Sequence, residues 1–361
     1  MPAEPRVAVP AASRVSARTS PPRRESVSSP LAVIRGLLNR SPVDGFVLAI
    51  LGAVLVAAFL PARGAAADVL DWVVVAAIAL LFFLYGTRLH PREALEGLKH
   101  WRLHVTILAF TFVVFPLVGL ALRPLVTPMV GADLANGLLF LCLVPSTVQS
   151  SIAFTSIARG NVPGAIVSAS TSNILGVFLT PLLVVALMST HNDMQIDASS
   201  VVKIVGQILV PFILGQIARP WVGGFFSRHA HATKFADRGS IVLVVYVAFS
   251  EGVREGIWSM VDAAQIVAVA VISLILVVVM LVVTRWVPQR LGFDRADVIA
   301  IQFCGTKKSL ATGLPMATVL FAGSTVGLIV LPLMIFHQIQ LILCSWLATR
   351  YGREPELVDA V

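Results

Sequence analysis

The sequence predicts an all-α integral membrane protein. Of its 361 residues, 57% are hydrophobic and only 13% are charged, and the mean hydropathy is +0.88. Soluble proteins are about 25% charged. The chain also contains many apolar runs of roughly 20 residues, the length that crosses a bilayer as a helix. These runs are continuous rather than alternating, which favours helices over a β-barrel.

We predict ten transmembrane helices. Their approximate ranges are 43–61, 69–88, 104–122, 133–157, 163–188, 201–218, 236–252, 264–286, 296–322 and 325–348. The seventh has the weakest signal, because its apolar stretch from Ile241 to Phe249 is too short to span the bilayer. That helix must therefore include Asp237, Ser250 or Glu251, or else tilt and line a water-filled cavity.

The two ends of the chain differ in composition from the apolar body. Residues 1–40 are rich in Ser, Pro, Ala and Arg and contain no apolar run long enough for a signal peptide. We expect a disordered, basic, cytoplasmic extension there, and a cytoplasmic tail at 351–361.

The positive charges fall mainly on one side of this predicted topology. Lys and Arg collect in cytoplasmic loops of membrane proteins. Apart from two lysines inside a span, 21 fall on the side of the termini and 4 on the other; Arg238 is counted among the 21. We therefore expect a multi-pass protein of a bacterial inner (plasma) membrane with both termini cytoplasmic. The formal charge of +8 then reflects orientation in the lipid bilayer, and no nucleic-acid partner is expected.

The ten helices divide into two five-helix repeats, 41–190 and 198–350, joined by the acidic linker HNDMQID (191–197). Because five is odd, the repeats must be inverted relative to each other. The fourth helix is interrupted at 144–151 and the ninth at 305–309, at corresponding places in the two repeats. Matching broken helices are typical of a transporter binding site.

Lys307 and Lys308 lie at the second interruption, within FCGTKKSLATGLP. Charges inside a membrane span indicate function, and the N-terminal ends of half-helices favour anions. The predicted substrate-binding residues are Thr147, Gln149, Ser150, Ser151, Ser172, Asn173, Thr306, Lys307, Lys308 and Ser309.

Two segments carry a family resemblance: FCGTKKSLATGLPMATVLF (303–321) and FTSIARGNVPGAIVSASTSNILGVFLTPLL (154–183). Over residues 41–350 the chain resembles the bile acid:sodium symporter superfamily, in the branch related to the seventh member of human solute carrier family ten. The resemblance implies inverted five-helix repeats, a core and a panel domain, and crossed discontinuous helices four and nine. It also implies symport of bile-acid-like or other organic anions.

The sodium ligands that the resemblance implies are mostly replaced. Matching by motif, oxygen-bearing residues of the superfamily become Ile152, Ala165, Ala169 and Phe303, and a glutamine becomes Lys307. A hard cation needs several oxygen ligands, and a nearby ammonium repels it. The sequence therefore makes sodium binding at the usual site electrostatically unfavourable, which argues against sodium coupling there.

The role of the lysines admits three interpretations. We expect the ammonium of Lys307 or Lys308 to stand in for sodium, pairing with helix C-terminal carbonyls and with Thr147, Ser150 or Ser151. A lysine can instead retain an anionic substrate from a cytoplasmic cavity. A buried lysine that releases its proton in one state would permit proton coupling, so the coupling ion is left open between proton and sodium.

The predicted function is secondary transport of a small organic anion by alternating access. No metal site is expected, because His191 and His337 lack ligand-like spacing with other His, Cys or acidic residues. Enzyme activity and a cofactor are not expected either. One alternative is a membrane regulator or assembly factor with a transporter fold, influencing ion homeostasis or envelope biogenesis. A membrane enzyme with a nucleophilic lysine is the other, although no catalytic carboxylate accompanies it.

Overall fold

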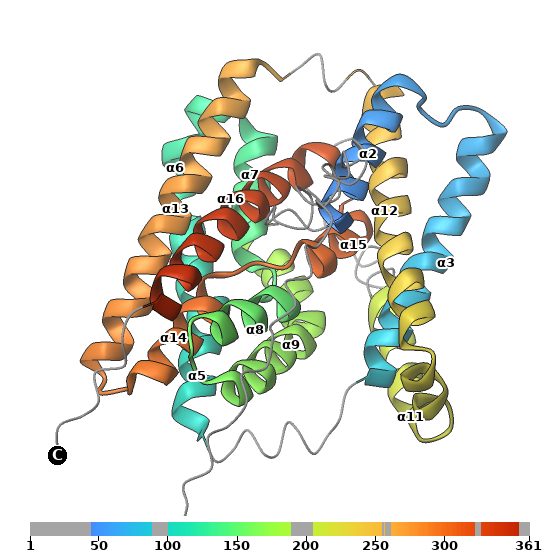
Figure 1. Ribbon diagram of the computed structural model, residues 1–361. Helices are drawn as coiled ribbons and strands as arrows, with labels where there is room; N and C mark the ends of the chain where they lie inside the picture. The colour runs from blue at the N-terminus through green and yellow to red at the C-terminus, as the bar shows by residue number, and fades with distance from the viewer. Residues whose placement is uncertain are drawn as a thin grey trace, which may run out of the picture. The chain divides into compact units, whose positions relative to one another are not determined.

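A computed structural model describes residues 45–88, 100–188, 205–254, 256, 261–321 and 326–353, and within these ranges every regular element is a helix (Figure 1). The elements are α2 (Gly45–Phe59), α3 (Ala65–Arg88), α5 (Trp101–Ala109), η2 (Phe110–Val114), α6 (Phe115–Val130), α7 (Ala132–Leu143), α8 (Val148–Ile157), α9 (Val162–Met188), η3 (Val205–Leu209), α11 (Val210–Arg228), α12 (Ala230–Arg254), α13 (Ala263–Arg290), α14 (Arg295–Thr306), α15 (Leu310–Leu320) and α16 (Val326–Arg353). They all belong to one unit, residues 42–361. The predicted all-α class is confirmed for the described residues.

Six described helices are long and apolar enough to cross a membrane, or seven if the bent pair α7 and α8 is one span. The six cover 65–87, 101–130, 162–188, 206–228, 263–290 and 326–353. The apolar part of α2, Leu48–Phe59, is shorter. A described helix or helix pair occupies each of the ten predicted ranges, but the ten-span count and the inverted repeats remain predictions.

Several helices extend beyond their predicted ends. The predicted loop 219–235 is largely helical, since α11 reaches Arg228 and α12 begins at Ala230, so α12 starts six residues before the predicted span 236–252. Similarly, α16 reaches Arg353 and buries Tyr351, which was expected in the tail. Hydropathy marks where apolar residues stop, whereas a helix continues as long as its backbone hydrogen bonds do.

Some predicted features lie outside the described residues. They are the N-terminal extension 1–40, the linker 191–197 with His191, and the tail from residue 354.

Helices α3 and α11 approach each other at a pair of glycines. A Cβ atom on Gly86 would lie 2.1 Å from the Phe212 carbonyl oxygen, and a Cβ on Gly215 would lie 2.1 Å from the Phe83 carbonyl oxygen. Small residues let two membrane helices bring their backbones together. Any side chain at these positions must push the helices apart.

We therefore expect Gly86→Ala to lower the free energy of unfolding by about 1–3 kcal/mol, because the clash is with backbone. Thermal unfolding in detergent micelles measures this. Gly224→Ala on α11 is the matched control, since nothing lies within 4 Å of its added Cβ and alanine favours a helix by roughly 0.5–1 kcal/mol. An unchanged melting temperature for Gly86→Ala would contradict the close packing.

Both predicted helix breaks are present. The chain leaves the helix after Leu143 and re-enters at Val148, with a bend of 62° between α7 and α8. Pro145 disfavours helical backbone at Val144, whose φ and ψ are −78° and 154°. The second break, residues 307–309, joins α14 to α15 (Figure 1).

Candidate functional site

The two helix breaks contact each other directly. The backbone N–H of Ser309 donates to the carbonyl oxygen of Pro145 at 2.8 Å. The Thr147 hydroxyl donates to the Lys308 carbonyl at 2.8 Å, and the Ser146 hydroxyl donates to the Cys304 carbonyl at 2.6 Å. The breaks, about 160 residues apart in sequence, thus satisfy each other's backbone groups, as buried polar groups require.

Lys308 places a cation at this junction. Its side chain is 0% exposed, and its Nζ donates to the carbonyl oxygens of Thr111, Cys142 and Val144 at 2.9, 2.9 and 3.0 Å. An ammonium has three donors, so all three are used. Cys142 and Val144 lie at the C-terminal end of α7, where the helix dipole favours a positive charge. The ammonium also lies 4.1 Å from the centre of the Phe115 ring.

The backbone of Lys308 is held as firmly as its side chain. Its N–H donates to Gln340 Oε1 at 2.9 Å, and its carbonyl accepts from Gln340 Nε2 at 2.8 Å. The carbonyl acceptors match the expected role of a lysine at helix C-terminal carbonyls. The predicted hydroxyl partners are wrong, because within the described residues the Lys308 ammonium bonds only backbone carbonyls and Thr147 donates to the Lys308 backbone instead.

Lys307 differs from its neighbour. Its Nζ is buried without a hydrogen-bond partner among the described residues, and it lies 3.6 Å from the centre of the Phe154 ring. The backbone at Lys307 is extended, with φ −83° and ψ 148°, so adjacent side chains point to opposite sides. Only one of the two lysines can therefore reach the α7 carbonyls.

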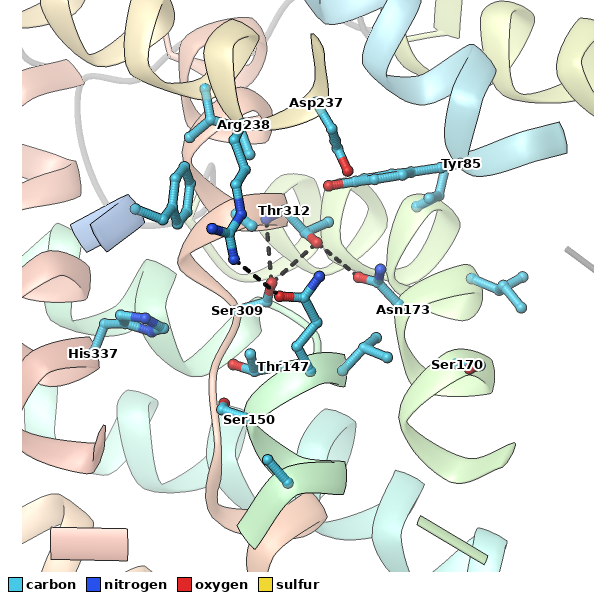
Figure 2. Close-up of a pocket in the computed structure, with 18 of the residues that line it drawn as sticks. Tyr85, Thr147, Ser150, Ser170, Asn173, Asp237, Arg238, Ser309, Thr312 and His337 are labelled. Atoms are coloured by element: carbon cyan, nitrogen blue, oxygen red, sulfur yellow. Dashed lines mark hydrogen bonds between the residues drawn. The ribbon is translucent and has the colours of Figure 1, made fainter. Parts of the chain in front are cut away.

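A cavity of about 550 Å³ opens beside the two breaks (Figure 2). Residues of α8, α9, α15 and α16 line one part of it, and residues of α2, α3, α11 and α12 line the rest. Its polar lining residues are Tyr85, Thr147, Gln149, Ser150, Ser170, Asn173, Asp237, Arg238, Ser309, Thr312 and His337. Its apolar lining residues are Phe46, Val148, Ala153, Phe154, Ile174, Val177, Phe212, Ile241, Ala311 and Leu341.

Arg238 brings a positive charge into the cavity from α12. Its Nη2 donates to Gln149 Oε1 on α8 at 3.4 Å, and its guanidinium lies 5.1 Å from the centre of the Phe46 ring. Figure 2 shows the side chain pointing toward Ser309, whereas Asp237 points toward Tyr85. The cation is therefore directed at the helix breaks and the neighbouring carboxylate is directed elsewhere.

The first turn of α8 lines the same cavity and lacks a side-chain cap. The hydroxyl of its N-cap residue, Thr147, is committed to the Lys308 carbonyl. The Ser150 Oγ atom is buried and has no hydrogen-bond partner among the described residues. By contrast, α15 is capped, since Ser309 accepts from the Thr312 N–H at 3.2 Å. An uncapped helix N-terminus presents free amides to an anion.

The structure brings together half of the predicted site residues. Those that line the cavity are Thr147, Gln149, Ser150, Asn173 and Ser309. The other five, which do not line it, are Ser151, Ser172, Thr306, Lys307 and Lys308.

Ser151, Ser172 and Thr306 instead bond within the protein. The Ser151 hydroxyl donates to the Phe303 carbonyl at 3.3 Å, and Ser172 Oγ accepts from the Ser146 N–H at 3.1 Å. Thr306 and Thr284 pair through their hydroxyls at 2.8 Å. These contacts support the helix breaks rather than the cavity.

Several lining residues were missed in the sequence, above all Arg238 but also Tyr85, Ser170, Thr312 and His337. One signal for Arg238 existed. The short apolar stretch after Asp237 raised the possibility of a helix that lines a water-filled cavity, and Arg238 falls inside that predicted span, 236–252, but it was counted only among the cations on the side of the termini.

Proteins with similar sequences are found among membrane transporters. The sequence profile of the SBF-like CPA transporter family matches residues 44–353. The Pseudomonas aeruginosa protein PA2026 is 52% identical over 313 residues, covering 87% of this chain and 94% of the relative. "Putative symporter YfeH" of Escherichia coli K12 is 46% identical over 318 residues, covering 88% and 96%. "Sodium/bile acid cotransporter 7-B" of Xenopus laevis is 28% identical over 316 residues, covering 86% and 92%.

These matches confirm the resemblance that the two sequence segments carry. The chain belongs to the SBF-like CPA transporter family, a membrane transporter family with relatives among the sodium/bile acid cotransporters.

Proposed function

We propose that this protein is a secondary transporter of small amphipathic organic anions, working by alternating access without sodium at the usual family site. The observation that carries the proposal is the cavity in which Arg238 is directed toward the uncapped N-terminus of α8. The inner membrane of a bacterium, with both termini cytoplasmic, is the expected location, and the distribution of Lys and Arg supports it.

An anion complements the polar end of the cavity. Arg238 offers guanidinium donors that suit a carboxylate, the first turn of α8 offers backbone amides, and Ser150 offers a hydroxyl without a protein partner. A carboxylate or sulfonate at this end of the cavity would complement both the guanidinium and the α8 amides. A neutral ligand would leave the Arg238 charge uncompensated, and a cationic ligand would be repelled by it.

The apolar part of the cavity favours an amphipathic ligand over an inorganic ion. Phe46, Ile174, Phe212 and Ile241 are among its lining residues. Apolar walls with a few convergent polar groups are typical of sites for organic molecules. We therefore expect a ligand with an apolar body and one acidic group.

The protein supplies its own cation where family resemblance implies sodium. Ala165, Ala169 and Phe303 are buried and bring no side-chain oxygen, and the Lys308 ammonium occupies the α7 carbonyls. The positive charge that helps hold the helix breaks together is thus covalently attached. This supports anion binding that does not depend on sodium.

Alternating access requires the two groups of helices around the cavity to move relative to each other. A side-chain hydrogen bond across the cavity joins Arg238 on α12 to Gln149 on α8 at 3.4 Å, near the limit for a hydrogen bond. A bound anion that takes the place of Gln149 would connect the two helix groups through Arg238. The ligand would then bias the moving parts by differential contacts.

We expect an amphipathic carboxylate or sulfonate to raise the melting temperature of the purified protein by the same amount in sodium and in choline buffers. At about 100 times the dissociation constant, binding adds roughly 2.7 kcal/mol to the free energy of unfolding. A thermal-stability screen of organic anions, each paired with its neutral alcohol analogue, makes this measurement. Stabilisation only in sodium would contradict sodium-independent binding, and no response to any anion would favour the regulator or assembly-factor function.

A further inference from the structure

A second basic site lies at the ends of α13, α14 and α16, apart from the cavity described above. It is a cavity of about 210 Å³, called here the arginine pocket, and it is lined by Arg285, Gln289, Phe293, Arg295, Val298, Ile299, Gln302 and Tyr351. None of these lining residues carries a carboxylate. The nearby acids have other contacts: Asp294 accepts from the Asp297 N–H at 2.7 Å, and Asp297 accepts from Asn161 at 2.6 Å.

Two arginines of the pocket converge on Tyr351. Nη1 of Arg285 donates to the Tyr351 hydroxyl and its guanidinium lies 4.8 Å from the centre of that ring, while Nη2 of Arg295 donates to the Tyr351 carbonyl at 3.0 Å. A guanidinium has five donors in a planar fork. The contact with Tyr351 orients Arg285 and leaves donors for an anion at the pocket mouth.

The outer face of α13 leads directly to this pocket. Val271, Ile275, Val278 and Val282 are exposed at spacings of three and four residues, so they form one stripe along the helix. The same stripe continues to the exposed residues Arg285 and Gln289. An apolar surface suited to lipid chains thus ends at a guanidinium, at the depth expected for lipid headgroups.

Two exposed tryptophans on the helices that form the pocket also indicate the membrane–water interface. Trp286 is 55% exposed and Arg290 lies over its ring, with its guanidinium 5.0 Å from the centre. On α16, exposed Trp346 has Arg350 over it at 5.8 Å. Tryptophan gathers at the membrane–water interface, and basic pockets between membrane helices bind phosphate headgroups.

We propose that the arginine pocket binds the phosphate headgroup of an anionic phospholipid, with the acyl chains along the exposed stripe of α13. The lipid, rather than a soluble phosphate, is the occupant because the apolar stripe is continuous with the pocket. The lipid is bound at a site separate from the transported anion, so this proposal does not rest on the proposed function.

Titration of the detergent-purified full chain with phosphatidylglycerol, followed by thermal unfolding, tests the proposal. The lipid should raise the melting temperature of the wild-type protein, and Arg285→Gln should need about tenfold more lipid for the same effect, because a charge-assisted hydrogen bond to phosphate is lost. Arg228→Gln removes the same charge from an exposed position on α11 and should behave as wild type.

Gln289→Glu is a second variant, which removes no described contact and should also weaken the lipid effect by repelling the phosphate. It keeps the test valid even where Arg285→Gln folds poorly. Equal lipid dependence of wild type and Gln289→Glu would overturn the proposal. Stabilisation by inorganic phosphate equal to that by phosphatidylglycerol would overturn it too, since the pocket would then be a site for free anions.

Discussion

Replacing Lys308 with methionine is expected to lower the free energy of unfolding by about 3–5 kcal/mol, because it leaves three buried carbonyl groups without their donor. Those carbonyls belong to Thr111, Cys142 and Val144, from two different parts of the chain. Their mutual approach depends on the ammonium between them. The loss should therefore loosen the junction of the two helix breaks as well as lower stability.

Lys307→Met is the matched control for this experiment. The two lysines are adjacent and both are buried, but Lys307 Nζ has no hydrogen-bond partner among the described residues. Methionine can keep a contact with the Phe154 ring and removes the desolvation cost of an amine that makes no hydrogen bond, so stability should stay equal or rise. Equal destabilisation by the two substitutions would contradict the separate roles of the lysines.

Unfolding can be followed with a thiol-reactive fluorogenic dye. Cys142, Cys304 and Cys344 are all free and buried, so they react only when the helices separate.

Replacing Arg238 with glutamine is expected to weaken binding of the organic anion by about 10- to 100-fold while leaving the fold intact. The lost interaction is a charge-assisted hydrogen bond in a largely apolar cavity, worth about 1.5–3 kcal/mol. Arg238 is only half-buried, and its hydrogen bond to Gln149 is long at 3.4 Å. Isothermal titration or thermal shift with the anion from the screen measures the change.

Two further variants sharpen that test. Arg238→Lys keeps the charge but loses the planar fork, so it should bind with intermediate affinity. Lys234→Gln removes the same charge from an exposed position one turn earlier on α12, outside the 550 Å³ cavity, and should bind as wild type. Wild-type affinity in Arg238→Gln would show that the anion is recognised elsewhere.

The sequence allowed the helix breaks to be located because their composition is unsuited to a continuous helix. Pro145 and the run from Gly305 to Ser309 mark the breaks, and intramembrane lysines mark one of them as functional. The class of fold was equally accessible, since long apolar runs have few alternatives to membrane helices.

The sequence did not reveal that Lys307 and Lys308 have different surroundings, with only Lys308 bonded to the α7 carbonyls. Helical periodicity assigns residues to faces, but both lysines lie at the break, where the extended backbone turns neighbours to opposite sides. Which side meets the α7 carbonyls depends on tertiary packing. Both lysines were therefore predicted to belong to one binding site, although only Lys308 bonds the carbonyl oxygens.

Arg238 was missed as a site residue for a related reason. The positive-inside pattern uses cations near the end of a span only to orient the chain, so Arg238 was counted for topology although it lies in the predicted span 236–252 and in α12. A cation at the end of an apolar stretch can lie in a loop or in a helix that borders a cavity. Only the packing of α12 against the helices around the cavity distinguishes the two.

Counterflow in proteoliposomes tests the central claim most directly. Liposomes containing wild-type protein are loaded with the unlabelled anion identified by the screen and diluted into sodium-free buffer with a trace of labelled anion. We expect labelled anion to accumulate with wild type and Lys234→Gln, and not with Arg238→Gln or protein-free liposomes. Accumulation only when sodium is added, or equal accumulation with Arg238→Gln, would contradict a sodium-independent anion transporter that recognises its substrate through Arg238.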